Sequence, residues 1–192
     1  MVIYDEDNSW VINNEDGTCT KIVDLPKCYS RLSNEAKCLE ILNGFIAPKL
    51  ISYDDDKHVL SMEYIEGLTL TKYIDKFGEI PKFYFAQLTT SLLQLLDHGI
   101  EYGADMKYDQ HFIIDDKNNI RIIDFGISNI LQGRDDIIEY WRENTVRNFA
   151  FVFKNSTEED IVESWERMCK YLYRYGISDS VMDKYFSNYD KI

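Results

Sequence analysis

An acidic side chain stands where a buried strand is predicted to end. Residues 120–123 are mostly isoleucine, and Asp124 follows them directly, before Phe125 and Gly126. Aspartate is a poor strand residue and is costly to bury without a partner. Two interpretations are open. Asp-x-Gly sequences often make a turn at a strand end, and an aspartate held at the rim of a sheet also suits a hard cation such as Mg²⁺.

A second carboxylate lies on an apolar helix face. Residues 32–44 are predicted to form a helix, in which Glu35 shares one face with Cys38, Leu39 and Leu42. A carboxylate buried on such a face needs a cation, because an unpaired charge inside a protein is strongly destabilising. We therefore expect Glu35 to form an ion pair inside the fold.

The elements that must position these residues change character near residue 66. The first part is predicted to contain two hairpins, with turns at residues 15–17 and 54–56, and a helix between them. The second part is predicted to be mainly helical, with helices over 69–78 and 82–99, a hairpin formed by 111–115 and 120–124, and a later helix that begins near Thr157. The sequence predicts an α+β fold in a single domain of residues 1–192.

Composition narrows the classes of partner and compartment. The formal net charge of −13 argues against nonspecific binding to nucleic acid or to an anionic membrane. No apolar run reaches the length of a membrane span, and the acidic N-terminus is unlike a signal peptide. We expect a cytoplasmic protein whose cysteines are free thiols, since their spacing does not suggest zinc: Cys19, Cys28, Cys38 and Cys169.

The order of these elements, with three motifs inside it, resembles the protein-kinase-like fold. Residues 62–67 (MEYIEG) resemble a kinase hinge, residues 104–114 (ADMKYDQHFII) a degenerate catalytic loop, and residues 124–126 (DFG) the metal-binding motif. The resemblance covers roughly residues 9 to 130. It implies a bilobal domain with a small β-rich N-lobe of about residues 1–66 and a reduced helical C-lobe of about residues 67–192.

The resemblance implies ATP and Mg²⁺ as cofactors, with Mn²⁺ as another possible metal. Phosphoryl transfer requires positive charge around the phosphates and a metal ion between them. Lys21 matches the phosphate-binding lysine and would pair with Glu35, while Asp124 would hold the metal. Lys21 also has an ordinary interpretation as a solvated strand lysine.

The resemblance also assigns roles within the catalytic loop. Asp105 would accept or orient the proton of the substrate hydroxyl, and Lys107 would steady the transferring phosphate. The family's second metal ligand, an asparagine, is absent. Counting forward from Asp105 places Gln110 at that position, whereas counting back from Asp124 places His111 there, and both stay open.

The resemblance also implies an adenine pocket, and the only argument for it is the position of these residues in the hinge-like segment. Met62 would form its back wall, and the backbone of Glu63, Tyr64 and Ile65 would offer hydrogen bonds to the base.

Several family features are missing. Residues 1–16 contain no glycine, so there is no glycine-rich loop, and the turn expected in its place is residues 5–9. Ala104 replaces the arginine beside the catalytic aspartate, and no Ala-Pro-Glu motif follows. Since Ser128 and Tyr140 are the only hydroxyls between Gly126 and residue 141, we expect activity that is not switched by phosphorylation of an activation segment.

We expect a minimal, atypical Ser/Thr protein kinase, similar in size to the Bud32 and RIO groups and to some small bacterial effector kinases. Its partner would be a protein substrate or an activating protein. One alternative is a pseudokinase that binds a protein and performs no chemistry, which the missing glycines favour. A further alternative is a small-molecule kinase of the aminoglycoside or choline type, although the chain has little room for the helical insertions of those enzymes.

Overall fold

The structure is a computed structural model, and it describes residues 2–6, 9–79, 81, 84–102, 110–133, 136, 170 and 173–174. The chain divides into two compact units. The first consists of residues 1–80 and 100–130, and the second of residues 81–99 and 131–192. The architecture mixes helices with β-sheet, as the α+β prediction requires.

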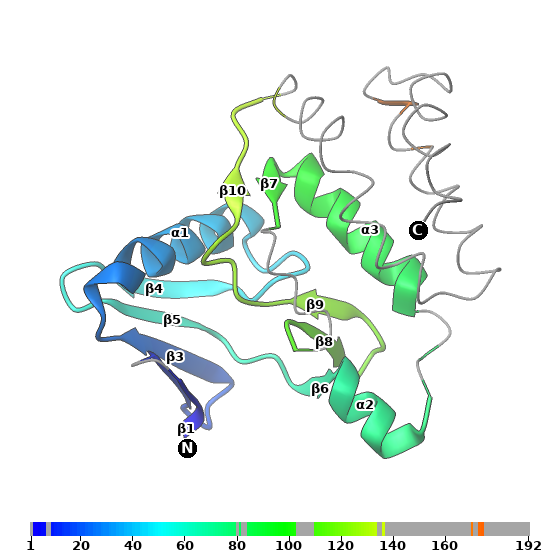
Figure 1. Cartoon of the computed structure of the whole chain (residues 1–192), viewed down its shortest axis with the longest axis horizontal. Coiled ribbons are helices and arrows are strands. Elements are labelled where there is room, and N and C mark those ends of the chain that lie inside the picture. Colours follow the sequence, from blue (N-terminus) through cyan, green and yellow to red (C-terminus); the bar gives the residue numbers. More distant parts are fainter. Residues whose placement is uncertain are drawn as a thin grey trace. The chain divides into compact units, whose positions relative to one another are not determined.

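The first unit is built on a five-stranded antiparallel sheet (Figure 1). Its strands lie in the order β1-β2-β3-β5-β4, with bounds β1 Val2–Glu6, β2 Ser9–Asn13, β3 Thr18–Val23, β4 Leu50–Asp54 and β5 Val59–Glu63. The two hairpins predicted around residues 15–17 and 54–56 are present as β2–β3 and β4–β5. Strand β1 was not predicted. Residues expected to form only a turn instead continue into a strand that pairs with β2, with Glu6 opposite Ser9.

Helix α1, Pro26–Leu42, packs beside β4 and against β3 and β5 (Figure 1). It begins six residues earlier than the apolar pattern suggested, because Pro26 occupies the first turn, where a missing N–H costs nothing. It ends where predicted, with Asn43 in the left-handed conformation at φ 45°. The predicted apolar face is buried, since Glu35, Cys38, Leu39 and Leu42 are all almost fully covered.

A second, three-stranded sheet of the first unit carries the hairpin that ends at Asp124. Its order is β6-β8-β9, with bounds β6 Gly67–Thr69, β8 Phe112–Asp115 and β9 Ile120–Ile122. A Cβ at Gly67 would lie 2.3 Å from the Ile114 carbonyl oxygen, so this pairing requires glycine. The side chain of Asp115 accepts hydrogen bonds from the amides of Lys117 and Asn119 and thereby closes the β8–β9 turn.

Shorter elements complete the first unit. Helix α2, Leu70–Phe77, starts one residue after Thr69, whose hydroxyl accepts a hydrogen bond from the Lys72 amide, and ends at Gly78 with φ 82°. Strands β7, Ile100–Glu101, and β10, Asn129–Ile130, form a two-stranded pair that the sequence did not predict.

In the second unit the structure describes helix α3, Tyr84–Asp97. The predicted apolar positions Leu88, Leu92, Leu95 and Leu96 are buried. The later helix expected near Thr157 falls almost entirely outside the described residues. Within the part of the chain that the structure describes, no helix is long and apolar enough to cross a membrane.

Candidate functional site

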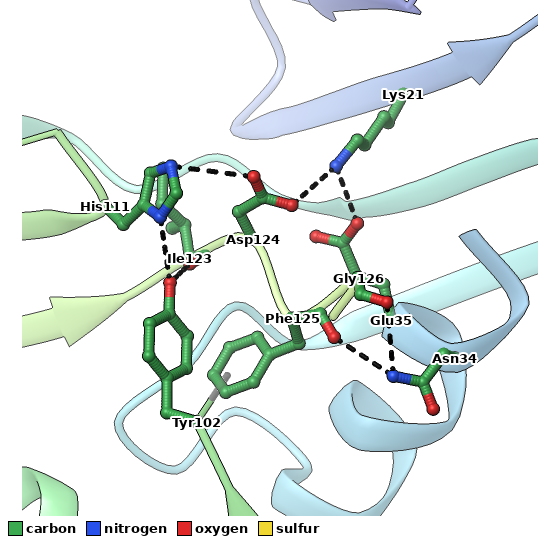
Figure 2. Close-up of polar contacts among 9 residues, drawn as sticks. All are labelled: Lys21, Asn34, Glu35, Tyr102, His111, Ile123, Asp124, Phe125 and Gly126. Carbon is green, nitrogen blue, oxygen red and sulfur yellow. Dashed lines mark hydrogen bonds and ion pairs between the residues drawn. The ribbon is translucent and has the colours of Figure 1, made fainter. Parts of the chain in front are cut away.

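Three charged side chains from distant parts of the sequence meet in the first unit (Figure 2). The Lys21 ammonium, on β3, donates to Glu35 Oε2 on α1 at 2.7 Å and to Asp124 Oδ1 after β9 at 3.0 Å. The ion pair predicted between Lys21 and Glu35 is therefore present. The cluster also joins the two carboxylates that the sequence singled out, through one cation.

Burial determines how the three groups ionise. The side chain of Glu35 is only 2% exposed and that of Lys21 16%. Burial raises the pKa of Glu35, and the nearby Lys21 ammonium opposes that rise. Burial alone would lower the pKa of Lys21, but Glu35 and Asp124 more than reverse this and raise it above its usual value. Lys21 is therefore a protonated cation at neutral pH.

Asp124 is held in an unusual backbone conformation. Its φ is 64°, in the left-handed region that glycine adopts routinely and that aspartate and asparagine adopt less often, helped by local hydrogen bonds. Burial would raise the pKa of its carboxyl, but Lys21, with smaller contributions from His111 and the Gly126 amide, brings that pKa below the ordinary value. The side chain, 44% exposed, is thus an ionised acceptor at neutral pH. Asp124 accepts a hydrogen bond from the Gly126 amide, which is a local turn contact, and it also forms a long-range ion pair with Lys21. The turn at the strand end and the pairing of the charge therefore occur together at this residue.

A histidine lies on the other side of the Asp124 carboxylate. His111 Nε2 is 3.6 Å from Asp124 Oδ2, and His111 Nδ1 is 3.1 Å from the Tyr102 hydroxyl oxygen. Of the two residues left open by counting, the structure brings His111 to Asp124, whereas Gln110 is exposed. The role of either residue as a metal ligand stays a prediction.

Tyr102 was missed by the sequence analysis. Its hydroxyl donates to the Ile123 carbonyl at 2.6 Å, and its ring packs edge-on against Phe125, with centroids 5.3 Å apart. It therefore supports the strand end on which Asp124 stands. The available signal was an aromatic residue just before the degenerate catalytic loop, where the sequence analysis had noted only that Ala104 replaces an arginine.

Asn34 was also missed, because it lies off the apolar face of α1. Its side-chain amide donates to the carbonyl oxygens of Phe125 and Gly126, at 3.2 and 3.3 Å (Figure 2). It also donates to the Ser128 carbonyl oxygen at 2.7 Å. Helix α1 thus holds the segment after Asp124 through two adjacent residues. Asn34 binds the segment directly, and Glu35 does so through Lys21 and by accepting a hydrogen bond from the Phe125 amide.

The segment proposed as a hinge already uses much of its hydrogen-bonding capacity. The Glu63 amide donates to the Lys49 carbonyl and the Tyr64 amide to the Gly17 carbonyl, both at 2.9 Å. The Glu63 carboxylate accepts from Arg121 at 3.1 Å. Among the three residues named for the base, these bonds leave the Ile65 amide as the donor for a nucleotide. Met62, the expected back wall, is buried on β5.

The predicted catalytic pair lies outside the described residues. Asp105 and Lys107 fall within residues 103–109, so their positions relative to Asp124 stay predictions.

Comparison with known proteins found partial similarity to protein kinases. The chain is 28% identical over 99 residues to mitogen-activated protein kinase kinase kinase 3 of Arabidopsis thaliana. It is 29% identical over 103 residues to NUAK family SNF1-like kinase 1 of Mus musculus and of Homo sapiens. These matches cover 47% to 49% of this chain but 15% of each relative. No family model matches the chain. The similarity supports a kinase-like domain within about half of the chain.

Proposed function

We propose that this protein is an ATP-dependent phosphotransferase of the protein kinase type, a minimal and atypical one that transfers phosphate to serine or threonine of a protein substrate. The observation that carries the proposal is the cluster of Lys21, Glu35 and Asp124. It assembles a protonated lysine and an ionised, partly exposed carboxylate from three separate elements. The partial similarity to kinases supports the same assignment.

The residues present fit the proposed cofactors. Lys21 would bind phosphate oxygens, since it stays protonated between two carboxylates. Asp124 would hold Mg²⁺, because its carboxylate is ionised and hard cations prefer oxygen ligands. When bound, the metal neutralises charge that develops on the transferred phosphoryl group. Asp105 would orient the acceptor hydroxyl, and Lys107 would contact the transferred phosphate.

Glu35 would act indirectly, by positioning the Lys21 ammonium. Its carboxylate fixes the Lys21 ammonium at 2.7 Å and so prevents the lysine from turning fully toward Asp124. This arrangement needs the helix α1 to stay packed on the sheet. An activating protein partner would act through that helix. We propose the cytoplasm as the compartment.

Thermal unfolding in the presence of ATP tests the proposal. With Mg²⁺ or Mn²⁺ present and ATP at a hundred times its Kd, the free energy of unfolding should rise by about 2.7 kcal/mol. Asp124→Asn should lose the part of this gain that depends on metal and keep its fold. Asp115→Asn is the matched control, because Asp115 only closes the β8–β9 turn. No stabilisation by ATP with any metal would refute nucleotide binding.

The second candidate is a pseudokinase that binds a protein partner. The absence of glycine from residues 1–16 favours it, since a glycine-rich loop normally covers the phosphates in kinases. The two functions differ in one measurement. A protein kinase transfers ³²P from ATP to a protein substrate and loses this transfer in Asp105→Ala, whereas a pseudokinase shows no transfer in either form. If the protein is a small-molecule kinase, ³²P from ATP should be transferred to an aminoglycoside or to choline instead.

A further inference from the structure

Arg121 joins three parts of the first unit that are far apart in the sequence. From the middle of β9, its Nη2 donates to the Ala47 carbonyl at 2.7 Å and to Glu63 Oε2 at 3.1 Å, with a longer contact to the Gly44 carbonyl at 3.4 Å. The two carbonyls belong to the loop between α1 and β4, and Glu63 is the last residue of β5. One guanidinium therefore holds this loop, the end of β5 and the middle of β9 together.

Glu63 is fixed to the same loop by both its side chain and its backbone. Its carboxylate accepts a hydrogen bond from the Lys49 amide at 3.0 Å, and its amide donates to the Lys49 carbonyl at 2.9 Å. The Ile122 amide adds a bond of 2.7 Å from β9 to the Ile46 carbonyl. The contacts thus form a closed network, in which the loop binds β5 and β9 and Arg121 binds all three.

The burial of Arg121 suggests that the network constrains geometry more than it adds stability. The side chain of Arg121 is 19% exposed and that of Glu63 38%, and the Arg121 Nε is buried without a hydrogen-bond partner among the described residues. A partly buried ion pair gains little net free energy, because the lost hydration of the charges offsets their attraction. An unpaired buried N–H adds a further cost. What the network supplies is a fixed position for β9.

This position is passed on to Asp124, which follows β9 after one intervening residue. That residue is also held, because the Ile123 amide donates to the His111 carbonyl at 3.0 Å. At the other end of the network, Glu63 begins the hinge-like segment of residues 63–65. The network therefore connects the segment proposed to bind the base with the carboxylate proposed to hold the metal.

We propose that Arg121 is a positioning residue for nucleotide binding. Through Glu63 and the loop after α1, it sets the position of Asp124 relative to the hinge-like segment, so that the base and the metal-bound phosphates of one nucleotide are held at the same time. Arg121 acts on the nucleotide only through these groups. This inference rests on the proposed function. The competing role is a purely structural one, in which Arg121 contributes stability and nothing else.

Comparing ATP with adenosine separates the two roles. In Arg121→Met, titration calorimetry should show that ATP with Mg²⁺ binds about tenfold more weakly, whereas adenosine, which has no phosphate to reach Asp124, should bind almost as in the wild type. Arg121→Lys, which keeps a charged donor, should recover most of the ATP affinity. Adding Glu63→Gln to Arg121→Met should cause little further loss, since the two side chains act as one unit.

Thr69→Ala is the control for a loss of stability alone. It removes the hydroxyl that caps α2 and should lower the free energy of unfolding without changing either affinity. The inference would be overturned by an unchanged ATP affinity in Arg121→Met, by equal losses for ATP and adenosine, or by an equal loss of ATP affinity in Thr69→Ala.

Hydrogen exchange tests the positioning without any nucleotide. In Arg121→Met, the amides of residues 122–126 should exchange faster while those of β2 keep their wild-type rates. This result in a protein that binds neither ATP nor adenosine would refute the proposed function and still support Arg121 as the residue that fixes Asp124. Exchange that is unchanged, or faster across the whole first unit, would contradict the positioning role whether or not the protein binds ATP.

Discussion

Lys21 is shared by two carboxylates of very different exposure, Glu35 at 2% and Asp124 at 44%. The buried partner depends on the lysine far more, because water cannot replace a lost cation at Glu35. The exposed partner is reached by water, and its second oxygen lies 3.6 Å from His111 Nε2. At the level of single residues, Glu35 is thus the buried, fixed end of the cluster, and Asp124 is the exposed end, to which the proposed function assigns the metal.

Lys21→Met should destabilise the protein by about 3–5 kcal/mol at neutral pH, since it leaves a buried carboxylate without a cation. The pKa of Glu35 is already raised by burial in the wild type, and without Lys21 both carboxylates should hold protons more tightly. A folded state that binds more protons than the unfolded one gains stability as pH falls. The loss relative to wild type should therefore shrink between about pH 7 and pH 5.

Chemical denaturation at several pH values measures this loss. The double variant Lys21→Met/Glu35→Gln is the control, in which the loss should be smaller and depend less on pH. A loss in Lys21→Met that is constant over this pH range would show that the buried pair is not its source.

Ser128 gives a second prediction for a single residue. Its side chain is buried, and its hydroxyl oxygen has no hydrogen-bond partner among the described residues. An unsatisfied buried hydroxyl costs about 1–3 kcal/mol, so Ser128→Ala should be neutral or stabilising in urea denaturation and should keep wild-type activity. Ser128→Asp would bury a charge and should destabilise. An activity lost in Ser128→Ala and restored by Ser128→Asp would instead identify Ser128 as a phosphorylation site.

Among the elements, helix α1 links the five-stranded sheet to the segment after β9. It contacts β3, β4 and β5, and Asn34 binds three carbonyl oxygens of residues 125–128. The loop after α1 is bonded to strand β9 itself. The Ile122 amide donates to the Ile46 carbonyl at 2.7 Å, and the Arg121 side chain donates to the Ala47 carbonyl at 2.7 Å. A displacement of α1 would therefore disturb Asp124 from two sides.

Asn34→Ala should loosen the segment after Asp124 more than it loosens the sheet. It removes the side-chain donor of three carbonyl groups, of which that of Phe125 still accepts from the Ser128 amide, at a cost of about 1–3 kcal/mol. Hydrogen exchange should become faster in residues 124–130, and metal-dependent ATP binding should weaken, while exchange in β3 and β5 changes little. Lys37→Ala, an exposed change in the same helix, is the control. Uniformly faster exchange across the first unit would show a general loss of stability and no specific positioning role.

The sequence predicted the elements with strong periodicity and left out those made by pairing. The apolar face of α1 and the hairpins around β3 and β5 followed from local patterns. Strands β7 and β10 are each two residues long and exist because they pair with each other, so no local pattern could indicate them. The contacts of Asn34 and Tyr102 depend on tertiary packing in the same way. Glu35 was found because a carboxylate on an apolar stripe is anomalous in the sequence itself.

At the scale of the whole first unit, two thiols report on how its core opens. Cys19 lies on β3 opposite Met62, and Cys38 lies on the buried face of α1, so they flank the interface between helix and sheet. Burial, with a smaller effect from Glu35, raises the pKa of Cys19 to about 11 and that of Cys38 to about 12. Only thiolates react readily with alkylating agents, so both should be inert in the native protein at neutral pH.

The last prediction is that Cys19 and Cys38 are alkylated only when the first unit unfolds as a whole. In a Cys169→Ser background, iodoacetamide at about pH 8 should modify Cys28, which is partly exposed, well before the other two. With increasing urea, the labelling of Cys19 and Cys38 should rise together and coincide with the loss of circular dichroism, because they share one cooperative core. Peptide mass spectrometry after a labelling pulse measures each site. Labelling of Cys38 at lower urea than Cys19 would show that α1 detaches from the sheet first, which would contradict a single cooperative unit. The same result would make helix displacement an accessible way to break the Lys21–Glu35 pair.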